Sequence, residues 1–546
     1  MAVHDSREVR MLRAGDCYLG VEPRMWEWIV AGALLALLLV IGHDLTQRTH
    51  AIIRNFPVIG HFRYWLEAVG PELRQYIVTG NDEERPFSRD QRRWVYASSK
   101  RENNYFGFGT DTDLDQVSNH VIVKHSAFPL PDPAPGQPGY DGRYRLPCAK
   151  VLGAWRQRPK AFRPASVVNI SGMSYGSLSA NAVEALNRGA ELAGCLQSTG
   201  EGGISRHHKH GGNLIWQVGT GYFGCRDAAG RFDRTLFRDA VLVNQVKAVE
   251  IKLSQGAKPG LGGILPKAKI TPEIAEIRGI PMDRDCISPP YHSEFSDPDG
   301  LLDFAEELAQ LTGVPVGIKS AIGESEFWVE LAHLMATTGR GVDFINVDGG
   351  EGGTGAGPLV FSDHVALPFR VGFPRVYRAM AEQGLHEKIV FVGAGRLGFP
   401  AQALLGMSLG CDLINVAREA MLSVGCIQAQ RCHTGECPTG VATQNAWLVR
   451  GLDPNLKSVR AANYITTLRK ELLQLSRACG QPHPALVGKR NIELLNGTSP
   501  GVTLPQLTGY DDEWGFPSVD DQATIAQIMA DIQGENPTGI LGTGKH

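Results

Sequence analysis

Short apolar runs rich in Val and Ile recur along the chain from Ser166 to Ala417, and Gly or Ser follows most of them. These runs are SVVNISG from Ser166, AVEIKLSQG from Ala248, VPVGIKS from Val314, VDFINVDGG from Val342, KIVFVGAG from Lys388 and CDLINVA from Cys411. Segments with helical periodicity lie between them, at 180–192, 301–311, 325–337 and 400–409. Alternation of strands and helices predicts parallel βαβ units, and strands that are apolar throughout predict a sheet buried on both faces.

The length of this alternating region favours an α/β fold of the (β/α)8 TIM-barrel type over residues 143–490. An open dinucleotide-binding sheet is the weaker choice, because no run is followed by the G-x-G-x-x-G fingerprint together with its later acidic residue. The segment PLPDPAPGQPGYDG, 129–142, is a Pro- and Gly-rich boundary before the barrel. We therefore expect an N-terminal helical and loop extension over 44–142, and an irregular, loop-rich C-terminal extension over 491–546.

The first 43 residues contain a separate apolar segment, WIVAGALLALLLVIG, which has no charged residue. As a helix it is about 22 Å long, and Met25 and Trp26 extend it toward the roughly 30 Å of a bilayer core. No small-residue cleavage site follows it, which disfavours a cleaved signal peptide. We assign 1–24 to a tail and 25–43 to a membrane anchor or interfacial helix, with a buried core helix as the alternative. Arginines flank both sides, and those nearest the segment favour an N-terminus inside.

Composition and charge argue against two classes of protein, those that bind nucleic acids and those built on disulfides. Hydrophobic residues make up 43% of the chain, which suffices for a large core, and the net charge is −3 without a long basic run. The chain therefore has no sign of a nucleic-acid surface. Ten cysteines in 546 residues do not form a disulfide scaffold.

The loops expected after the strands carry most of the candidate chemistry, since a barrel places its active site where the strands end. They are SGMSYGSLS, QSTGEGGIS with Glu201, EIKLSQGAKPGLGG with Lys252 and Lys258, GIKS with Lys319, VDGGEGGTGAGP with Asp348 and Glu351, VGAGRLG and VARE. Each has an ordinary explanation alone: a tight turn, a surface salt bridge or a helix cap. Together, three lysines and many glycines at one rim predict anionic ligands, such as a flavin phosphate and a carboxylate substrate.

Three cysteines cluster in GCIQAQRCHTGECPTG, residues 425–440, as Cys426-x5-Cys432-x4-Cys437 followed by proline. Close-set thiolates with a proline after the last are typical of iron–sulfur ligation, and three cysteines suit a 3Fe–4S cluster or a 4Fe–4S cluster with one open iron. Zinc would need His433 as a fourth ligand, which is awkward beside Cys432. The spacing favours iron–sulfur and leaves zinc or unliganded thiols as alternatives.

The motifs SGMSYGSLS, STGEGG, EIKLSQGAKPGLGGILP, ISPPYH, GGTGAGPL and GCIQAQRCHTGECPTGVATQ resemble, in this order, the FMN-binding synthase domain of glutamate synthase. The resemblance spans about 169–444. It implies a (β/α)8 barrel with FMN in its mouth and a 3Fe–4S cluster beside it. In that family electrons pass through the cluster to FMN, and 2-iminoglutarate, formed from 2-oxoglutarate and ammonia, is reduced to L-glutamate.

The resemblance also assigns residues. Cys426, Cys432 and Cys437 would hold the cluster. The FMN-binding residues would be Met173, Ser174, Ser198, Lys319, Gly353, Gly393, Gly395 and Ala417. Glu201, Lys252, Gln255 and Lys258 would face the carboxylates and the imine, with Glu201 supplying or positioning a proton. Glu351, assigned to the substrate side, stands where the family usually has Asp, and Gly357 where it has Ser, so the substrate can differ from that of the family.

The expected partners follow from what the sequence lacks. We expect no glutaminase domain, C-terminal β-helical domain or NAD-binding half, so the amine would come from free ammonia, a separate glutaminase subunit or another donor. Electrons would come from ferredoxin or a membrane donor, with the catalytic domain in the cytoplasm. One alternative is chemistry of the N-methylglutamate synthase type with methylamine. Another is a membrane-tethered electron-transfer subunit, which Lys252, Gln255 and Lys258 argue against. The cysteine motif contradicts a barrel like that of IMP dehydrogenase.

Overall fold

The computed structural model describes residues 23–534, and its contacts divide the chain into two compact units, Met1–Glu84 and Arg85–His546. This division falls well before the Pro- and Gly-rich boundary expected at 129–142. Most of the tail expected at 1–24, and the last residues of the C-terminal extension, lie outside the described part.

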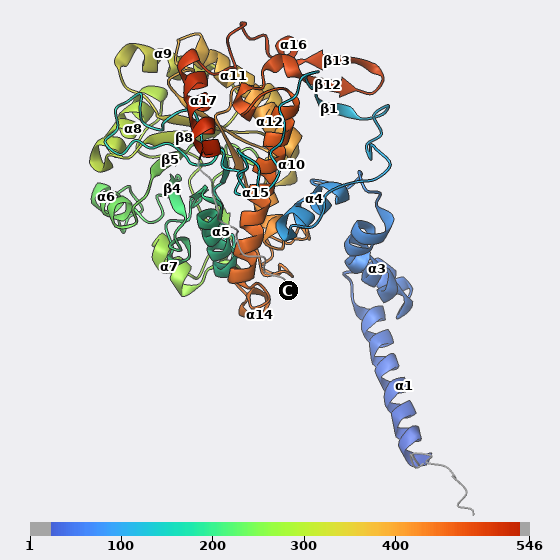
Figure 1. Ribbon diagram of the computed structural model, residues 1–546. Helices are drawn as coiled ribbons and strands as arrows, with labels where there is room; N and C mark the ends of the chain where they lie inside the picture. The colour runs from blue at the N-terminus through green and yellow to red at the C-terminus, as the bar shows by residue number, and fades with distance from the viewer. Residues whose placement is uncertain (1–22, 535–546) are drawn as a thin grey trace, which may run out of the picture. The chain divides into compact units, whose positions relative to one another are not determined.

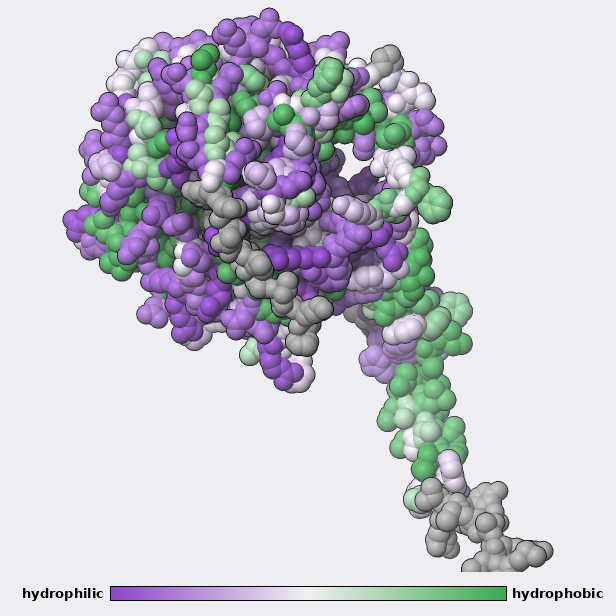
Figure 2. Space-filling view, in the orientation of Figure 1, coloured by the Kyte–Doolittle hydropathy of each residue, from purple (hydrophilic) through white to green (hydrophobic). Residues whose placement is uncertain are grey.

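The first unit is helical (Figure 1). It consists of α1 (Pro23–Thr46), α2 (Ala51–Asn55), α3 (Ile59–Leu73) and a π-helical turn, Arg74–Val78. Residues Met25–Thr46 of α1 are long and apolar enough to cross a membrane, and no residue of their most apolar stretch is buried within the protein, a criterion of length and composition that a signal sequence would also meet. Its surface is green, and hence apolar, along most of its length in Figure 2. The alternative of a buried core helix is therefore wrong for the described unit.

A buried carboxylate near the end of α1 joins this helix by hydrogen bonds to the segment that follows it. Asp44 is fully shielded from solvent. Its oxygens accept hydrogen bonds from the backbone N–H of Val58 at 2.9 Å and from the ring of His61 at 2.9 Å. An unpaired carboxylate without water is costly, so these partners hold α2 and α3 against the end of α1.

The second unit is built on a closed barrel of eight parallel strands, which confirms the predicted fold. The strands follow one another around the barrel as β10-β11-β2-β3-β4-β5-β8-β9. Their bounds are β2 Val168–Ile170, β3 Leu196–Ser198, β4 Asn213–Val218, β5 Ala248–Lys252, β8 Val316–Ala321, β9 Phe344–Asp348, β10 Val390–Ala394 and β11 Leu413–Val416. The apolar runs named from the sequence account for all of these except β3, which has three residues, and β4, whose Asn213 and Gln217 break the apolar pattern.

Helices surround the barrel (Figure 1). They are α5 Ala180–Ala193, α6 Arg234–Val243, α7 Pro272–Arg278, α8 Pro298–Thr312, α9 Glu326–Thr338, α10 Leu359–His364, α11 Phe369–Ala381, α12 Pro400–Ser408, α13 Arg418–Ser423, α14 Ala446–Val449 and α15 Pro454–Ala478. Four of them match the predicted helical segments. Apolar side chains fill two places: a large layer between strands and helices, and a smaller cluster inside the barrel that includes Leu152, Ile215 and Phe344.

The two extensions of the barrel pack together. Helix α4 (Arg89–Lys100) lies on α15 and α13. Strand β1 (Ser118–Val123) pairs antiparallel with β12 (Ile492–Asn496), which pairs with β13 (Ser499–Thr503). A short hairpin of β6 (Ile264–Leu265) and β7 (Cys286–Ile287) flanks α7, and α16 (Leu504–Thr508) and α17 (Val519–Gly534) follow β13. The C-terminal extension is thus more regular than expected, because its strands depend on a partner more than 350 residues away in sequence.

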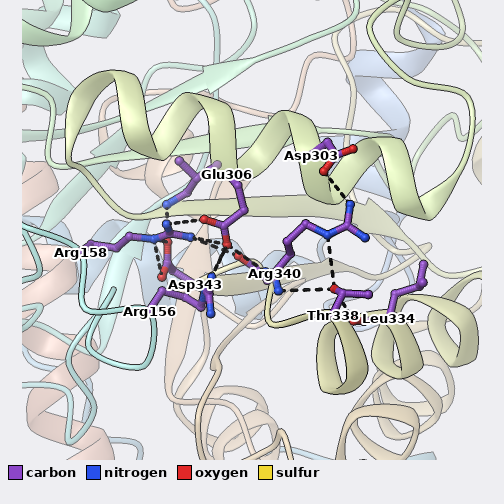
Figure 3. A network of polar contacts seen from close by, with 10 residues as sticks. Arg156, Arg158, Asp303, Glu306, Leu334, Thr338, Arg340 and Asp343 are labelled. Atoms are coloured by element: carbon purple, nitrogen blue, oxygen red, sulfur yellow. Dashed lines mark hydrogen bonds and ion pairs between the residues drawn. The ribbon is translucent and has the colours of Figure 1, made fainter.

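A buried ion network joins α8, the start of β9 and the segment before β2 (Figure 3). Arg158 donates to Glu306 at 2.7 Å and to Asp343 at 3.0 Å. Asp343 also accepts from the backbone N–H of Val316 at 2.7 Å, and Glu306 from that of Gly341 at 3.0 Å. Arg158 therefore pairs with two largely buried carboxylates, and Arg156 adds a second cation at Glu306, with 2.9 Å between Arg156 Nη2 and Glu306 Oε1.

Replacing Arg158 with Met is expected to destabilise the barrel by about 3–5 kcal/mol, because the fully buried Asp343 loses its cation and Glu306 keeps only Arg156. The measurement is the midpoint of urea unfolding, followed by circular dichroism. The control is Asp303→Asn, which removes an ion pair of Arg340 at a side chain that is 70% exposed. Exposed pairs contribute about 0–1 kcal/mol. Equal midpoints for the two variants would contradict the structural role of Arg158.

Candidate functional site

The residues predicted to bind a flavin or a substrate gather at one rim of the barrel. Ser198 and Lys252 are the last residues of β3 and β5, and Lys319 lies in the second half of β8. The others follow directly after strands, except Gly393, which lies within β10. Because parallel strands of a barrel all end on the same side, this rim collects groups that are far apart in sequence.

An ion pair between Glu201 and Lys252 forms the centre of the rim. Glu201 Oε2 lies 2.9 Å from Lys252 Nζ, and the same ammonium donates to Gln255 Oε1 at 2.8 Å. Burial by itself raises the pKa of Glu201, but the charge and hydrogen bond of Lys252 outweigh it, and the net pKa is lowered. Glu201 is therefore ionised at neutral pH, and it serves as an acceptor and counter-ion in the resting site.

Two further lysines point into the same region. Lys258 is buried and donates to the backbone oxygen of Ala356 at 2.9 Å. Burial lowers the pKa of Lys258, against the opposing charge of Glu201. Lys319 Nζ lies 3.5 Å from Asp348 Oδ2, and the carboxylates around it raise its pKa although burial acts in the opposite direction. The rim therefore holds three buried ammonium groups, and Lys258 has no carboxylate within ion-pair distance among the residues that the structure describes.

Glycines allow Glu201 to sit between two loops. A Cβ at Gly263 would lie 2.5 Å from Glu201 Oε1, and one at Gly219 would lie 2.9 Å from Glu201 Oε2. Real side chains do not tolerate such distances, so these positions must be glycine for the carboxylate to keep its place. This explains part of the high glycine content of the loops.

The interior of the barrel below the rim contains a polar network that the sequence analysis missed. Gln217 donates to Glu250 at 2.5 Å, and Asn346 donates to the other oxygen of Glu250 at 2.7 Å. Because Glu250 takes the amide N–H groups, the amide oxygen of Asn346 is left buried without a partner, as is the hydroxyl of Ser198. Buried polar atoms of this kind normally have partners, so these two atoms are available to hydrogen-bond a polar ligand or a water molecule. The only signal in sequence was the interruption of apolar strands by polar residues.

His292, the histidine of the motif ISPPYH, forms a hydrogen bond to the backbone of Lys252 and so helps to position it. The Nε2–H of His292 donates to the backbone oxygen of Lys252 at 2.9 Å, and its Nδ1 accepts from the hydroxyl of Tyr222 at 3.0 Å. Burial lowers the pKa of His292 to about 4, so the ring is neutral in this position. No role for His292 was predicted from the sequence.

Not every predicted residue turns toward the rim. The carboxylate of Glu351 accepts from the backbone N–H of Phe369 at 2.8 Å and so caps the start of α11. A Cβ at Gly393 would face Cys411 and Phe369 in the layer under the helices. Gly395, at φ 128°, approaches the backbone of Gly349. The remaining predicted positions lie half-buried or in close contacts on rim loops: Met173, Ser174, Gln255, Gly353 and Ala417.

The three clustered cysteines lie on the loop after α13. Cys437 is buried, and Cys426 and Cys432 are half-buried against the same core. The backbone N–H of Gln428 donates to the sulfur of Cys426 at 3.4 Å. The side chain of Gln428 in turn holds both backbone groups of Phe87, at 3.0 Å each, so the segment before α4 fixes this loop.

The thiols are close enough to influence one another, but the protein atoms alone do not complete a metal site. Burial raises the pKa of Cys426 to about 12, and the sulfurs of Cys432 and Cys437 add to the rise. Within residues 23–534, no three His, Cys, Asp or Glu side chains form a group that could hold a metal ion as they stand. The thiols are free, and burial lowers the pKa of the neighbouring Lys269 to about 8 against the opposing effect of Cys432 and Cys437.

Comparison with known proteins gives consistent matches to one family. A family model described as "Conserved region in glutamate synthase" matches residues 153–482, more than half of the chain. The chain is 37% identical over 479 residues to the glutamate synthase large subunit-like protein YerD of Bacillus subtilis (strain 168), covering 82% of this chain and 90% of that protein.

More distant relatives match over the barrel region. The archaeal-type glutamate synthase (NADPH) of Thermotoga maritima is 35% identical over 316 residues, and the match covers 57% of this chain and 59% of that protein. Among solved structures, a mandelate oxidase variant with a monooxide FMN adduct matches at 14% identity and a TM-score of 0.41, covering 71% of this chain and 94% of that one. This last likeness adds nothing to the barrel that the strand pairing already defines.

Replacing Gly263 with Ala is expected to displace the carboxylate of Glu201 from Lys252, because the added methyl group would overlap Glu201 Oε1. Without the ion pair, the amine of Lys252 is no longer held against Glu201 and is freer to react. Lys252 should therefore react several-fold faster with acetic anhydride, measured by peptide mass spectrometry. The control is Gly323→Ala, where no atom lies within 4 Å of the new methyl group. Unchanged labelling of Lys252 in Gly263→Ala would refute the packing described for Glu201.

Proposed function

Because the chain belongs to the glutamate synthase family, we propose that it is a flavin- and iron–sulfur-dependent oxidoreductase that reduces 2-iminoglutarate, formed from 2-oxoglutarate and ammonia, to L-glutamate. The observation that carries the proposal is the group formed by Glu201, Lys252 and Lys258 at the mouth of the barrel. An enzyme for a neutral or cationic substrate would have no use for this excess of buried positive charge.

The substrate chemistry matches these three side chains. A dicarboxylate brings two negative charges, and Lys252 and Lys258 supply two ammonium groups held by Gln255 and by the backbone of Ala356. Glu201 is ionised and is the natural partner for the positive charge of an iminium nitrogen. Lys258, whose pKa is lowered by burial, gives up a proton more readily than a surface lysine and can donate to the nitrogen during reduction.

The interior of the barrel has the properties expected of an FMN site. The unpartnered oxygens of Ser198 and Asn346 offer hydrogen bonds to a flat polar ligand. The glycine loop near Gly395 allows close backbone approach, and Lys319 places a cation at the rim. Hydride for the reaction would come from the reduced flavin, which would receive its electrons through the iron–sulfur cluster.

The cysteine loop supplies a donor set that suits a 3Fe–4S cluster. Three neighbouring thiols on one loop, a backbone N–H directed at one sulfur and a nearby buried ammonium are consistent with a bound anionic cluster. The side chains as they stand do not form a group for a single metal ion, whereas in a cluster each thiolate would bind a different iron. Cys426, Cys432 and Cys437 would be its ligands.

The sources of ammonia and electrons lie outside the described site. This chain spans 59% of the length of the archaeal-type relative from Thermotoga maritima. We propose that ammonia reaches the site from solution or from a separate glutaminase subunit, and that a ferredoxin or a membrane donor reduces the cluster. Methylamine is the alternative amine.

We further propose that α1 attaches the protein to a membrane with the barrel in the cytoplasm. Helix α1 has the length and composition of a membrane span. After it, exposed apolar side chains recur at helical spacing and form one stripe: Ile59, Phe62, Leu66, Leu73 and Ile77. A stripe of this kind beside a membrane helix suits the boundary between lipid head groups and acyl chains.

The proposed reaction predicts a cluster signal, a flavin and a product that depend on separate parts of the chain. Protein purified without oxygen should show flavin absorbance and the electron paramagnetic resonance (EPR) signal of an iron–sulfur cluster. It should form glutamate from 2-oxoglutarate, ammonia and a reduced donor. In Cys432→Ser, the cluster signal and donor-linked turnover should fall at least tenfold while FMN remains bound, because the flavin groups lie on other loops.

Cys479→Ser is the matched control, since Cys479 is a buried thiol near Lys124 and away from the cysteine loop. A flavin without a cluster signal in the wild-type protein would refute the assignment of the cysteines. Product from methylamine but not ammonia would favour the N-methylglutamate type of reaction. A flavin and a cluster with no product from either amine would indicate an electron-transfer subunit.

Two charges in the middle of α1 should release the protein from membranes. Leu35→Arg combined with Leu38→Arg places two arginines in the apolar segment, at about 2.5–3.5 kcal/mol each by insertion scales. Wild-type protein should stay in the membrane pellet after extraction with alkaline carbonate, and the double variant should move to the supernatant. The control is Leu192→Arg, at an exposed leucine of α5. Release of the wild-type protein would contradict a spanning α1.

A further inference from the structure

Lys269 is a buried cation that joins the cysteine loop to the loop after β2. It ends the 3-10 turn Lys267–Lys269, which follows β6, and only 2% of its surface is exposed. Its Nζ donates to the backbone oxygen of Ser177 at 2.7 Å and to that of Cys432 at 3.3 Å. Ser177 belongs to the loop SGMSYGSLS, so one ammonium group bridges the loop predicted to line the flavin and the loop that carries the thiols.

The charge of Lys269 lacks a carboxylate partner in the described part of the chain. The ion pairs of residues 23–534 include none to Lys269, and the other cation near it, Arg278, adds repulsion. The acidic groups that interact with Lys269 are the thiols of Cys432 and Cys437. A buried ammonium is strongly disfavoured without a compensating negative charge. The groups in position to supply that charge are the sulfurs.

We propose that Lys269 is the counter-ion of the iron–sulfur cluster and the residue that positions its loop against the flavin loop. The inference rests on the proposed function, because it needs the cluster. Uptake of one electron makes a cluster more negative by one charge. A fixed cation beside two of its sulfurs stabilises that reduced state, and the low effective dielectric of a buried site strengthens the effect. Lys269 thus favours entry of electrons into the cluster.

A purely structural role would give a different result. If Lys269 only joined two loops by hydrogen bonds, replacing it would affect stability and cluster content without a consistent effect on reduction potential. If it acts through its charge, the sign of the effect is fixed in advance. Removal of the positive charge makes reduction harder, so the potential moves to more negative values.

The test compares three variants of the full-length, detergent-solubilised protein. Lys269→Met removes the charge and keeps the length of the side chain, whereas Lys269→Arg keeps the charge. Lys267→Met is the matched control, because Lys267 lies on the same turn but is exposed. Iron, sulfide and flavin contents are measured first. The reduction potential of the cluster is then determined by titration with dithionite and redox mediators, followed by EPR.

We expect Lys269→Met to keep the cluster and to have a more negative cluster potential than the wild type. Lys269→Arg should keep the cluster and stay near the wild-type potential, and Lys267→Met should be unchanged because solvent screens an exposed charge. An unchanged potential in Lys269→Met, or loss of the cluster in either Lys269 variant, would overturn the counter-ion role. Absence of iron and sulfide from the wild-type protein would instead refute the proposed function.

Discussion

Closure of eight parallel strands into a barrel is the constraint on which the rest of this molecule depends. It brings the ends of β3, β5, β8 and β9 to one rim, although the residues there span about 150 positions in sequence. A single short loop could not bring Glu201, Lys252 and Asp348 to the same rim, because they follow or end three different strands. The buried network around Arg158 lies at the opposite end of the barrel, where β8 and β9 begin, and links the chain segments there.

The rim and the cysteine loop share an electrostatic feature, an excess of buried cations. Lys252 and Lys319 are paired with carboxylates, whereas Lys258 and Lys269 donate to backbone oxygens and lack acidic partners at ion-pair distance in the described chain. Buried ammonium groups are stabilised by negative charge nearby. A dicarboxylate at one place and an iron–sulfur cluster at the other would provide it.

Much of the site could be predicted, because the end of a strand is recognisable from residues that are neighbours in the sequence. Apolar runs, most of them followed by Gly or Ser, identified six of the barrel strands, and Lys252 and Lys258 lie at or after the end of one of them. Glu201 was found instead by the glycine-rich loop that holds it. The roles of Glu250, Asn346 and His292 were not predictable, since each depends on partners from other strands and loops. Glu351 looked like a rim residue by position, but its carboxylate caps α11, which only the path of the chain after the loop determines.

The sequence by itself determined the alternation of strands and helices, the apolar segment of α1, the spacing of the three cysteines and the residues offered at each strand end. These properties depend on neighbours along the chain. The tertiary structure decided which of those residues meet, how their charges are compensated, and that β1 pairs with a strand near the other end of the chain. Burial and charge pairing depend on residues that are close in three dimensions but distant in sequence. Lys269 is an example, because its ammonium group donates to the backbones of two loops that lie far from it along the chain.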